Sequence, residues 1–125
     1  MELKMECIIP EVLIMSMFDT AKDSLTIDVS KFQKAFYHLK KKPEFKDIMR
    51  EIRFRGSPAS PYSEDLDEAL SNLQYIHVLS RKNPDLVEYM KAEKFTETWK
   101  KLNSKYDTAI QSLISEIGKK IVTSL

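Results

Sequence analysis

Apolar residues recur every three or four positions along much of the chain, which is the spacing that places them on one face of a helix. Such runs cover about residues 10–22 and 28–41. Two more cover about residues 43–53, where Pro43 suits a first helical turn, and 64–74. The pattern therefore predicts four helices in this part of the chain.

Other segments depart from the helical spacing. Residues 25–27 form a short extended link, and residues 56–62 hold two prolines and one glycine, which predicts a loop without a strand ladder. Residues 75–79 and 86–90 are rich in β-branched and aromatic side chains, and the turn-forming residues 80–85 separate them. This arrangement predicts a two-stranded β-hairpin.

The C-terminal third has a spacing close to a heptad repeat. Its apolar positions alternate in steps of four and three: Phe95, Trp99, Leu102, Tyr106, Ala109, Leu113, Ile117 and Ile121. The spacing predicts one long helix or two helices joined near Asn103. A continuous helix of about 30 residues would extend about 45 Å, more than a small domain covers. We therefore expect residues 93–125 to be a C-terminal helix of the same domain that forms a homodimer.

Three short motifs stand out along the chain: the run KFQKAFYHL at residues 31–39, FRG at 54–56 and PYSEDLDEAL at 61–70. Together they resemble small prokaryotic winged-helix proteins of the phage-associated antitoxin-like group. In that group a glycine directly precedes the proline, whereas residues 57–60 are inserted here. The similarity covers about residues 8–92. It implies a mainly α winged helix-turn-helix domain over residues 1–92, with the hairpin as the wing.

The resemblance implies a DNA-binding ancestor, but fold alone does not settle function. The group includes regulators, antitoxins and proteins of no known activity. We interpret the chain as a non-catalytic DNA-associated regulator or antitoxin-like protein. The alternative is a protein-interaction module that keeps the winged-helix fold without reading DNA.

The charge balance is nearly even overall, with 20 Lys and Arg against 19 Asp and Glu, which gives a formal charge of +1. This excludes a histone-like polycation and an acidic disordered tail. The charges are unevenly distributed, however. Residues 31–55 hold nine basic and three acidic residues, a net of +6, whereas residues 1–30 hold two and six, a net of −4.

The predicted helix at 64–74 begins with acidic residues, which phosphates repel, so it is a poor reader of DNA bases. Contacts to duplex DNA are therefore predicted from the basic residues Lys40, Lys41, Lys42, Lys46, Arg53, Arg55, Arg81 and Lys82. Such contacts give weak sequence specificity and strong salt dependence. Alternatively, Lys40, Lys41 and Lys42 complement the negative end of their own helix dipole.

A protein partner is the competing expectation. Its candidate contacts are the acidic residues Glu64, Asp67 and Glu68 and the aromatic residues Trp99 and Tyr106. Alternatively, the acidic side chains stabilise the positive end of their own helix dipole. The two aromatic residues, seven positions apart, can likewise form part of a packing stripe along one face of the last helix.

Catalytic and metal chemistry find little support in the sequence. Cys7, His38 and His77 are the candidates for a metal ligand set or a Cys–His nucleophilic pair, but they are widely separated in the sequence and no orienting group is evident. We predict neither enzyme activity, nor a metal, nor a cofactor. A single cysteine makes no internal disulfide, and the longest apolar stretch, about residues 12–18, is far shorter than a membrane span of about 20. We expect a cytoplasmic protein without membrane partners.

Overall fold

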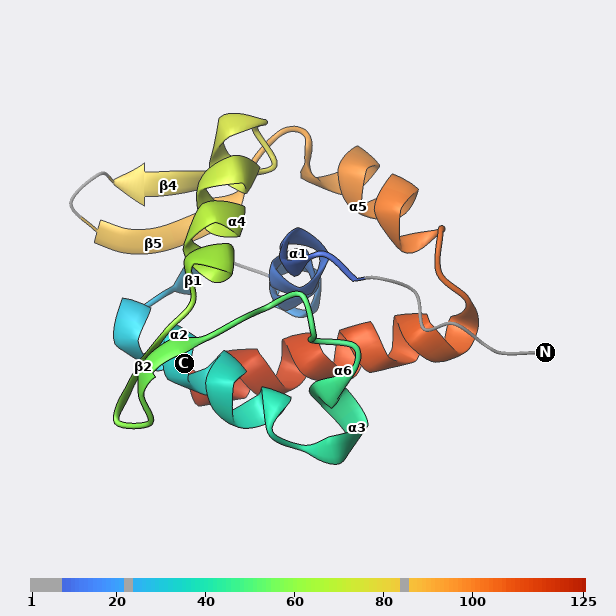
Figure 1. Cartoon of the computed structure of the whole chain (residues 1–125). Coiled ribbons are helices and arrows are strands. Elements are labelled where there is room, and N and C mark those ends of the chain that lie inside the picture. Colours follow the sequence, from blue (N-terminus) through green and yellow to red (C-terminus); the bar gives the residue numbers. More distant parts are fainter. Residues whose placement is uncertain (1–7, 22–23, 84–85) are drawn as a thin grey trace.

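The computed structural model is mainly helical with two small antiparallel sheets (Figure 1). It describes residues 8–21, 24–83 and 86–125. In chain order the elements are α1 (Pro10–Thr20), β1 (Leu25–Thr26), α2 (Val29–Lys40), α3 (Pro43–Lys46), β2 (Arg55–Ser57), β3 (Ser60–Tyr62), α4 (Glu64–Tyr75), β4 (Leu79–Asn83), β5 (Leu86–Lys91), α5 (Phe95–Asn103) and α6 (Thr108–Ser124).

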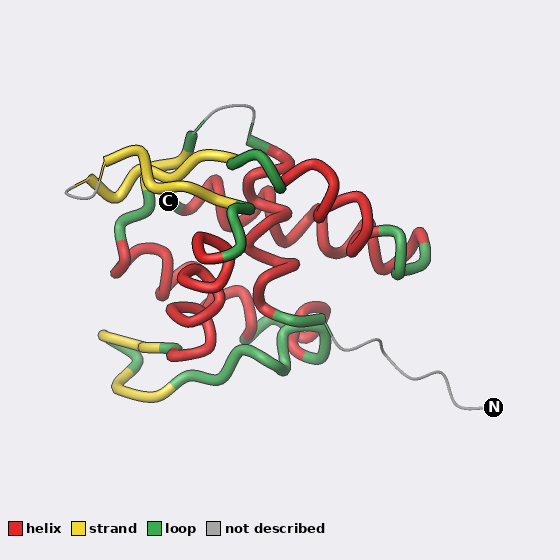
Figure 2. Tube along the Cα trace, turned by 90° about the horizontal axis from the view of Figure 1, so that it is seen from above, coloured by secondary structure: helices red, strands yellow, loops and turns green. Residues whose placement is uncertain are grey.

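Helix α1 is the centre of the core. Every residue from Val12 to Phe18 is buried, and α4, α5 and α6 pack around it (Figures 1 and 2). A helix that is apolar on almost all sides is stable only when other elements enclose it. The prediction of a core helix here is confirmed, and the helix ends at Thr20.

The larger sheet has the strand order β1-β5-β4, with both pairings antiparallel. The predicted hairpin, formed by β4 and β5, is therefore present. Part of the predicted extended link, Leu25–Thr26, forms β1, which is the third strand of the sheet. Leu25 pairs with Tyr89, and the Ser24 hydroxyl donates a hydrogen bond to the Glu88 carboxylate.

The first strand of this hairpin begins later than predicted. Tyr75 is the last residue of α4, and His77 adopts a left-handed conformation with φ of 64°. The Val78 N–H then donates to the Leu73 carbonyl at 2.9 Å, which closes the helix as a Schellman motif does. The prediction of a strand over residues 75–79 was therefore wrong except at Leu79, because His77 takes the position that glycine usually marks. The predicted turn at residues 80–85 was wrong for residues 80–83, because β4 continues to Asn83.

The prediction of a loop without a ladder at residues 56–62 was also wrong. Strands β2 and β3 form a short antiparallel pair in which Gly56 lies opposite Pro61. Gly56 has φ of 90°, and a β carbon there would lie 2.8 Å from the Ser60 carbonyl oxygen. Glycine therefore permits the close approach, and a two-stranded edge pairing tolerates a proline, which offers no N–H.

Helix α3 is shorter than predicted, whereas the C-terminal third matches one of its two predicted arrangements. Helix α3 ends at Lys46 rather than near Arg53, and turns follow it, although Phe45, Ile48 and Ile52 are buried as the pattern indicated. The C-terminal third forms two helices, α5 and α6, which confirms the alternative of a junction near Asn103.

Helix α6 packs on α1 and α2 of its own chain, and Ile114, Ile117 and Ile121 are buried there. Its 17 residues extend about 26 Å, so the argument from excess length for a homodimer no longer applies. The homodimer itself stays a prediction. No helix in the described residues is long and apolar enough to cross a membrane.

Candidate functional site

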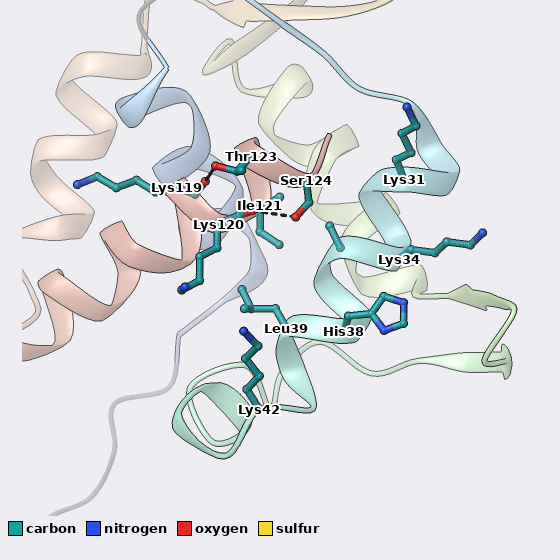
Figure 3. A pocket seen from close by; sticks show the side chains of 11 residues that line it. Lys31, Lys34, His38, Leu39, Lys42, Lys119, Lys120, Ile121, Thr123 and Ser124 are labelled. Carbon is teal, nitrogen blue, oxygen red and sulfur yellow. Dashed lines mark hydrogen bonds between the residues drawn. The ribbon is translucent and has the colours of Figure 1, made fainter.

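A groove of about 710 Å³ lies between α2 and the C-terminal part of α6 (Figure 3). Leu39 of α2 and Ile121 of α6 lie between the two helices, and lysine side chains extend outward around them. The residues that line it are Lys31, Lys34, Ala35, His38, Leu39, Lys42, Lys119, Lys120, Ile121, Thr123 and Ser124. We call this the α2–α6 groove.

The helical spacing of apolar residues places the lysines at the groove. Phe32, Phe36 and Leu39 turn one face of α2 into the core, so Lys31 and Lys34 are left exposed beside it. In α6, burial of Ile117 and Ile121 similarly leaves Lys119 and Lys120 exposed. The Asp28 side chain caps α2 by accepting a hydrogen bond of 3.1 Å from the Lys31 N–H.

The charge of the groove is uniformly positive. Five lysines line it and no Asp or Glu does. Among the described residues, none of these five lysines forms an ion pair. Positive charges that line a groove without a carboxylate among them concentrate anions, so the α2–α6 groove is a candidate anion-binding site.

The hydroxyl groups in the groove are already engaged. Thr123 donates to the Lys119 carbonyl at 2.9 Å, and Ser124 donates to the Lys120 carbonyl at 3.0 Å. The donors that remain for a ligand are the lysine ammonium groups and the exposed His38 imidazole. The groove therefore favours a fully charged anionic group over a neutral polyol.

A second, smaller hollow of about 380 Å³ lies on another side of α2. Its lining residues are Tyr37, Lys40, Lys41, Lys46 and Phe54, again without a carboxylate. The Lys41 ammonium lies 4.3 Å from the centre of the Tyr37 ring, which itself packs edge-on against Phe54 at 5.4 Å. The two hollows thus extend the basic surface along both sides of α2.

The predicted DNA-contacting residues at the end of α2 have different surroundings. Lys41 and Lys42 are exposed, whereas the Lys40 ammonium donates to the Ile52 carbonyl at 2.5 Å. Burial lowers the pKa of Lys40; nearby Asp65 opposes this, and Arg53 and Lys46 add to it. Through its hydrogen bond to the Ile52 carbonyl, Lys40 joins α2 to the segment after α3.

The two predicted arginines near β2 are paired with acids of α4. The Arg53 guanidinium donates to both carboxylate oxygens of Asp65, at 3.1 and 3.2 Å, and Arg55 forms an ion pair with Glu64. Hydrogen bonds from the Arg53 side chain lower the pKa of Asp65 below its usual value of 3.8, although partial burial opposes this. These pairs offset much of the acidic charge on the first turn of α4.

The remaining predicted contacts lie away from the groove. Arg81 of β4 donates to the Tyr89 hydroxyl at 3.0 Å, and Lys82 is in β4 with its side chain outside the described part of the structure. Asp67 and Glu68 are exposed on α4. Their positions do not test the predicted roles.

The aromatic candidates for a partner surface are half-buried at the C-terminal helices. Trp99 stacks on Phe95 of α5, with ring centres 6.4 Å apart, and Tyr106 packs against the core in the link between α5 and α6. Both contacts agree with the alternative of a packing stripe.

The described residues contain no group of three or more His, Cys, Asp and Glu side chains placed to hold a metal ion. This part of the chain therefore adds no support for the metal site or for the nucleophilic pair. Cys7 lies outside them.

Sequence reasoning missed the α2–α6 groove. Lys31 and Lys34 belong to the basic segment at residues 31–55, but nothing in the sequence distinguishes them there, and Lys119 and Lys120 lie outside that segment. The available signal was the pair of adjacent lysines in a C-terminal helix whose only other charged residue is Glu116. Comparisons with protein-family models, curated proteins and solved structures found no match to this chain.

Proposed function

We propose that the protein is a non-catalytic, DNA-associated winged-helix domain, of the antitoxin-like kind that its motifs resemble, that contacts phosphates through α2 and α6. One observation carries the proposal. Eight lysines line the two hollows beside α2, five in one and three in the other, and no carboxylate lines either. Clustered Lys and Arg side chains on one face are the electrostatic footprint of nucleic-acid binding.

The order of elements supports the winged-helix part of the proposal. Helices α1, α2 and α4 precede the hairpin β4–β5, and α4 leads into it through a tight turn. Helix α3 and the pair β2–β3 form an insertion between the second and third of these helices. In this reading the hairpin is the wing, and Arg81 and Lys82 lie on its first strand.

We do not propose that α4 reads the DNA sequence. Its outer face carries Asp67 and Glu68, and carboxylates there repel the flanking phosphates. Lysines on phosphates give affinity for any duplex. If five lysines contact phosphates, the logarithm of the binding constant falls with the logarithm of salt concentration with a slope of about −4.5.

The test is binding of a random duplex to the full chain at several salt concentrations. In the main variant, Lys34→Glu and Lys120→Glu are combined, and we expect affinity to fall about tenfold or more, with a shallower salt slope. The matched control combines Lys100→Glu and Lys101→Glu, which changes the same charge on exposed positions of α5. Equal losses in both variants, or no salt-dependent binding by the wild type, would reject the proposal.

A protein-interaction module is the second candidate, and the surface of α4 favours it. Asp67 and Glu68 are exposed, and Tyr75 on the last turn is 86% exposed. Exposed acids and an exposed aromatic ring about two turns apart on one helix suit a basic partner segment. Titration of a Lys- and Arg-rich peptide tests this: binding that disappears when Asp67→Asn and Glu68→Gln are combined favours the module, and unchanged binding counts against it.

Self-association is proposed as a property of the same protein. We expect a homodimer through the surface of the C-terminal helices, as the sequence predicted. Sedimentation of the full chain at micromolar concentration tests it, and a monomer mass there rejects it. Truncation after Met90 is unsuitable because α6 supplies Ile114, Ile117 and Ile121 to the core.

A further inference from the structure

We propose that the α2–α6 groove binds a small anionic amphiphile, a molecule with a phosphate or carboxylate head and an aliphatic body. This ligand site goes beyond the proposed DNA binding. Its volume of about 710 Å³ lies within the range of about 300–1,000 Å³ typical of small-molecule sites. A surface that contacts only DNA phosphates has no need of a concave groove with an apolar floor.

The floor of the groove sets the chemistry of the ligand body. It consists of Ala35 and Leu39 from α2 and Ile121 from α6, all aliphatic. Apart from the exposed His38 imidazole, none of the lining residues carries an aromatic ring. The groove therefore offers a nucleobase no ring to stack on other than His38, and its apolar contacts suit an alkyl chain.

The rim sets the chemistry of the head group. Lysines stand on both walls, Lys31, Lys34 and Lys42 on the α2 side and Lys119 and Lys120 on the α6 side. Their methylene stems can cover an alkyl chain while the ammonium groups reach its anionic end. Thr123 and Ser124 donate their hydroxyl hydrogens within α6, so the head is recognised chiefly by charge.

The experiment titrates isotopically labelled full-length protein with decyl phosphate below its micelle concentration and follows the backbone amide signals. We expect shifts concentrated at residues 31–42 and 119–124. We also expect a Kd at least about tenfold lower than that of inorganic phosphate, because the aliphatic body adds apolar contact. Decanoate should bind at the same positions, and decyltrimethylammonium should not.

Two variants locate the site. Ala35→Phe fills the floor from a half-buried helical position without changing charge, and we expect it to weaken decyl phosphate binding about tenfold. The combined Lys119→Gln and Lys120→Gln variant changes only exposed side chains and should also weaken binding several-fold. The combined Lys100→Gln and Lys101→Gln variant of α5 should bind as the wild type does.

The results separate this inference from the proposed function. Retained decyl phosphate binding in a folded Ala35→Phe protein, or in the combined Lys119→Gln and Lys120→Gln variant, would overturn it. Equal binding of the cationic amphiphile, or binding to anionic phospholipid vesicles without binding to monomeric decyl phosphate, would overturn it as well. Loss of DNA binding in the charge-reversed Lys34 and Lys120 variant bears only on the DNA proposal.

Discussion

Gly118 of α6 lies directly against the main chain of Ser16 in α1. A β carbon at Gly118 would lie 2.8 Å from the carbonyl carbon and oxygen of Ser16 and 2.5 Å from its hydroxyl oxygen. Ser16 is itself fully buried, and its hydroxyl donates to the Leu13 carbonyl at 2.6 Å. The absence of a side chain at Gly118 therefore brings the two helices together and places the following lysines of α6 beside α2.

Gly118→Ala is expected to destabilise the protein by about 1–3 kcal/mol, because the added methyl group meets backbone atoms that cannot rotate away. The direction of the change in stability is informative, because a Gly→Ala change at an exposed helical position stabilises a protein by about 0.5–1 kcal/mol. Urea unfolding followed by circular dichroism measures it. The change should also alter the amide signals of residues 119–124, because the helix must move away from α1.

Ser112→Ala is the matched control for this prediction, because Ser112 is exposed on the same helix. It should change stability by no more than about 0.5 kcal/mol. Wild-type stability in the Gly118→Ala protein would mean that α1 and α6 lie farther apart than described.

Gln33 joins α2 to the start of α4. Its side-chain oxygen accepts a hydrogen bond of 2.8 Å from the Ser63 N–H, and its amide nitrogen donates to the Ser63 carbonyl at 3.2 Å. Both residues are buried, so Gln33→Leu leaves a buried N–H without an acceptor and should cost about 1–3 kcal/mol. Gln33→Glu should cost more, because it brings a negative charge against the Ser63 carbonyl.

The measurement is again urea unfolding, with Lys34→Ala on the exposed side of α2 as the control. That control should stay within about 0.5 kcal/mol of the wild type. A Gln33→Leu protein as stable as the control would show that the two hydrogen bonds contribute nothing net.

Asp65 is expected to make stability depend on pH below about 4. Hydrogen bonds from Arg53 lower its pKa in the folded protein below the usual 3.8, so its contribution is present above that value. The contribution is lost as the pH falls through the lower, folded-state pKa. Asp65→Asn should therefore lower the Tm by a few degrees at pH 7 and by progressively less as the pH falls from 4 toward 2.

Thermal unfolding of the wild type and of Asp65→Asn at four pH values provides the measurement. Added salt should also reduce the difference at pH 7, because Arg53 is 80% exposed. A difference in Tm that is the same at pH 7 and pH 2 would contradict the assigned cause.

Local sequence signals predicted much of the fold. Apolar periodicity placed α1, α2 and α4 to within about two residues, and capping oxygens of Asp28 and Ser63 now mark the starts of two of these helices. The turn that follows α4, and with it the start of β4, was missed, because a left-handed His77 has no signal as plain as a glycine. The pairing of β2 with β3 was missed because the rule against proline in a ladder was applied to an edge pair.

The candidate site was less accessible to sequence reasoning. Lys34 and Lys120 are 86 positions apart, and they line one groove only because α6 packs back on α1 and α2. Counting charges along the sequence identified the basic segment at residues 31–55, but it could not show which acidic side chains lie next to that segment in the fold. It therefore treated Arg53 and Arg55 like the other cations, although each is paired with a carboxylate of α4.

The final prediction concerns which face of the protein meets DNA. No residue of α4 lines the α2–α6 groove, and charges farther apart than about 8 Å are largely screened at physiological salt. Combining Asp67→Lys with Glu68→Lys should therefore raise affinity for a random duplex no more than about threefold at that salt concentration. The combined Lys34→Glu and Lys120→Glu variant, with an equal and opposite change of charge, should lose about tenfold or more. Fluorescence anisotropy with a labelled duplex measures both. A gain of more than about tenfold from the α4 variant would instead place the DNA on α4, because only charges close to the phosphates have so large an effect.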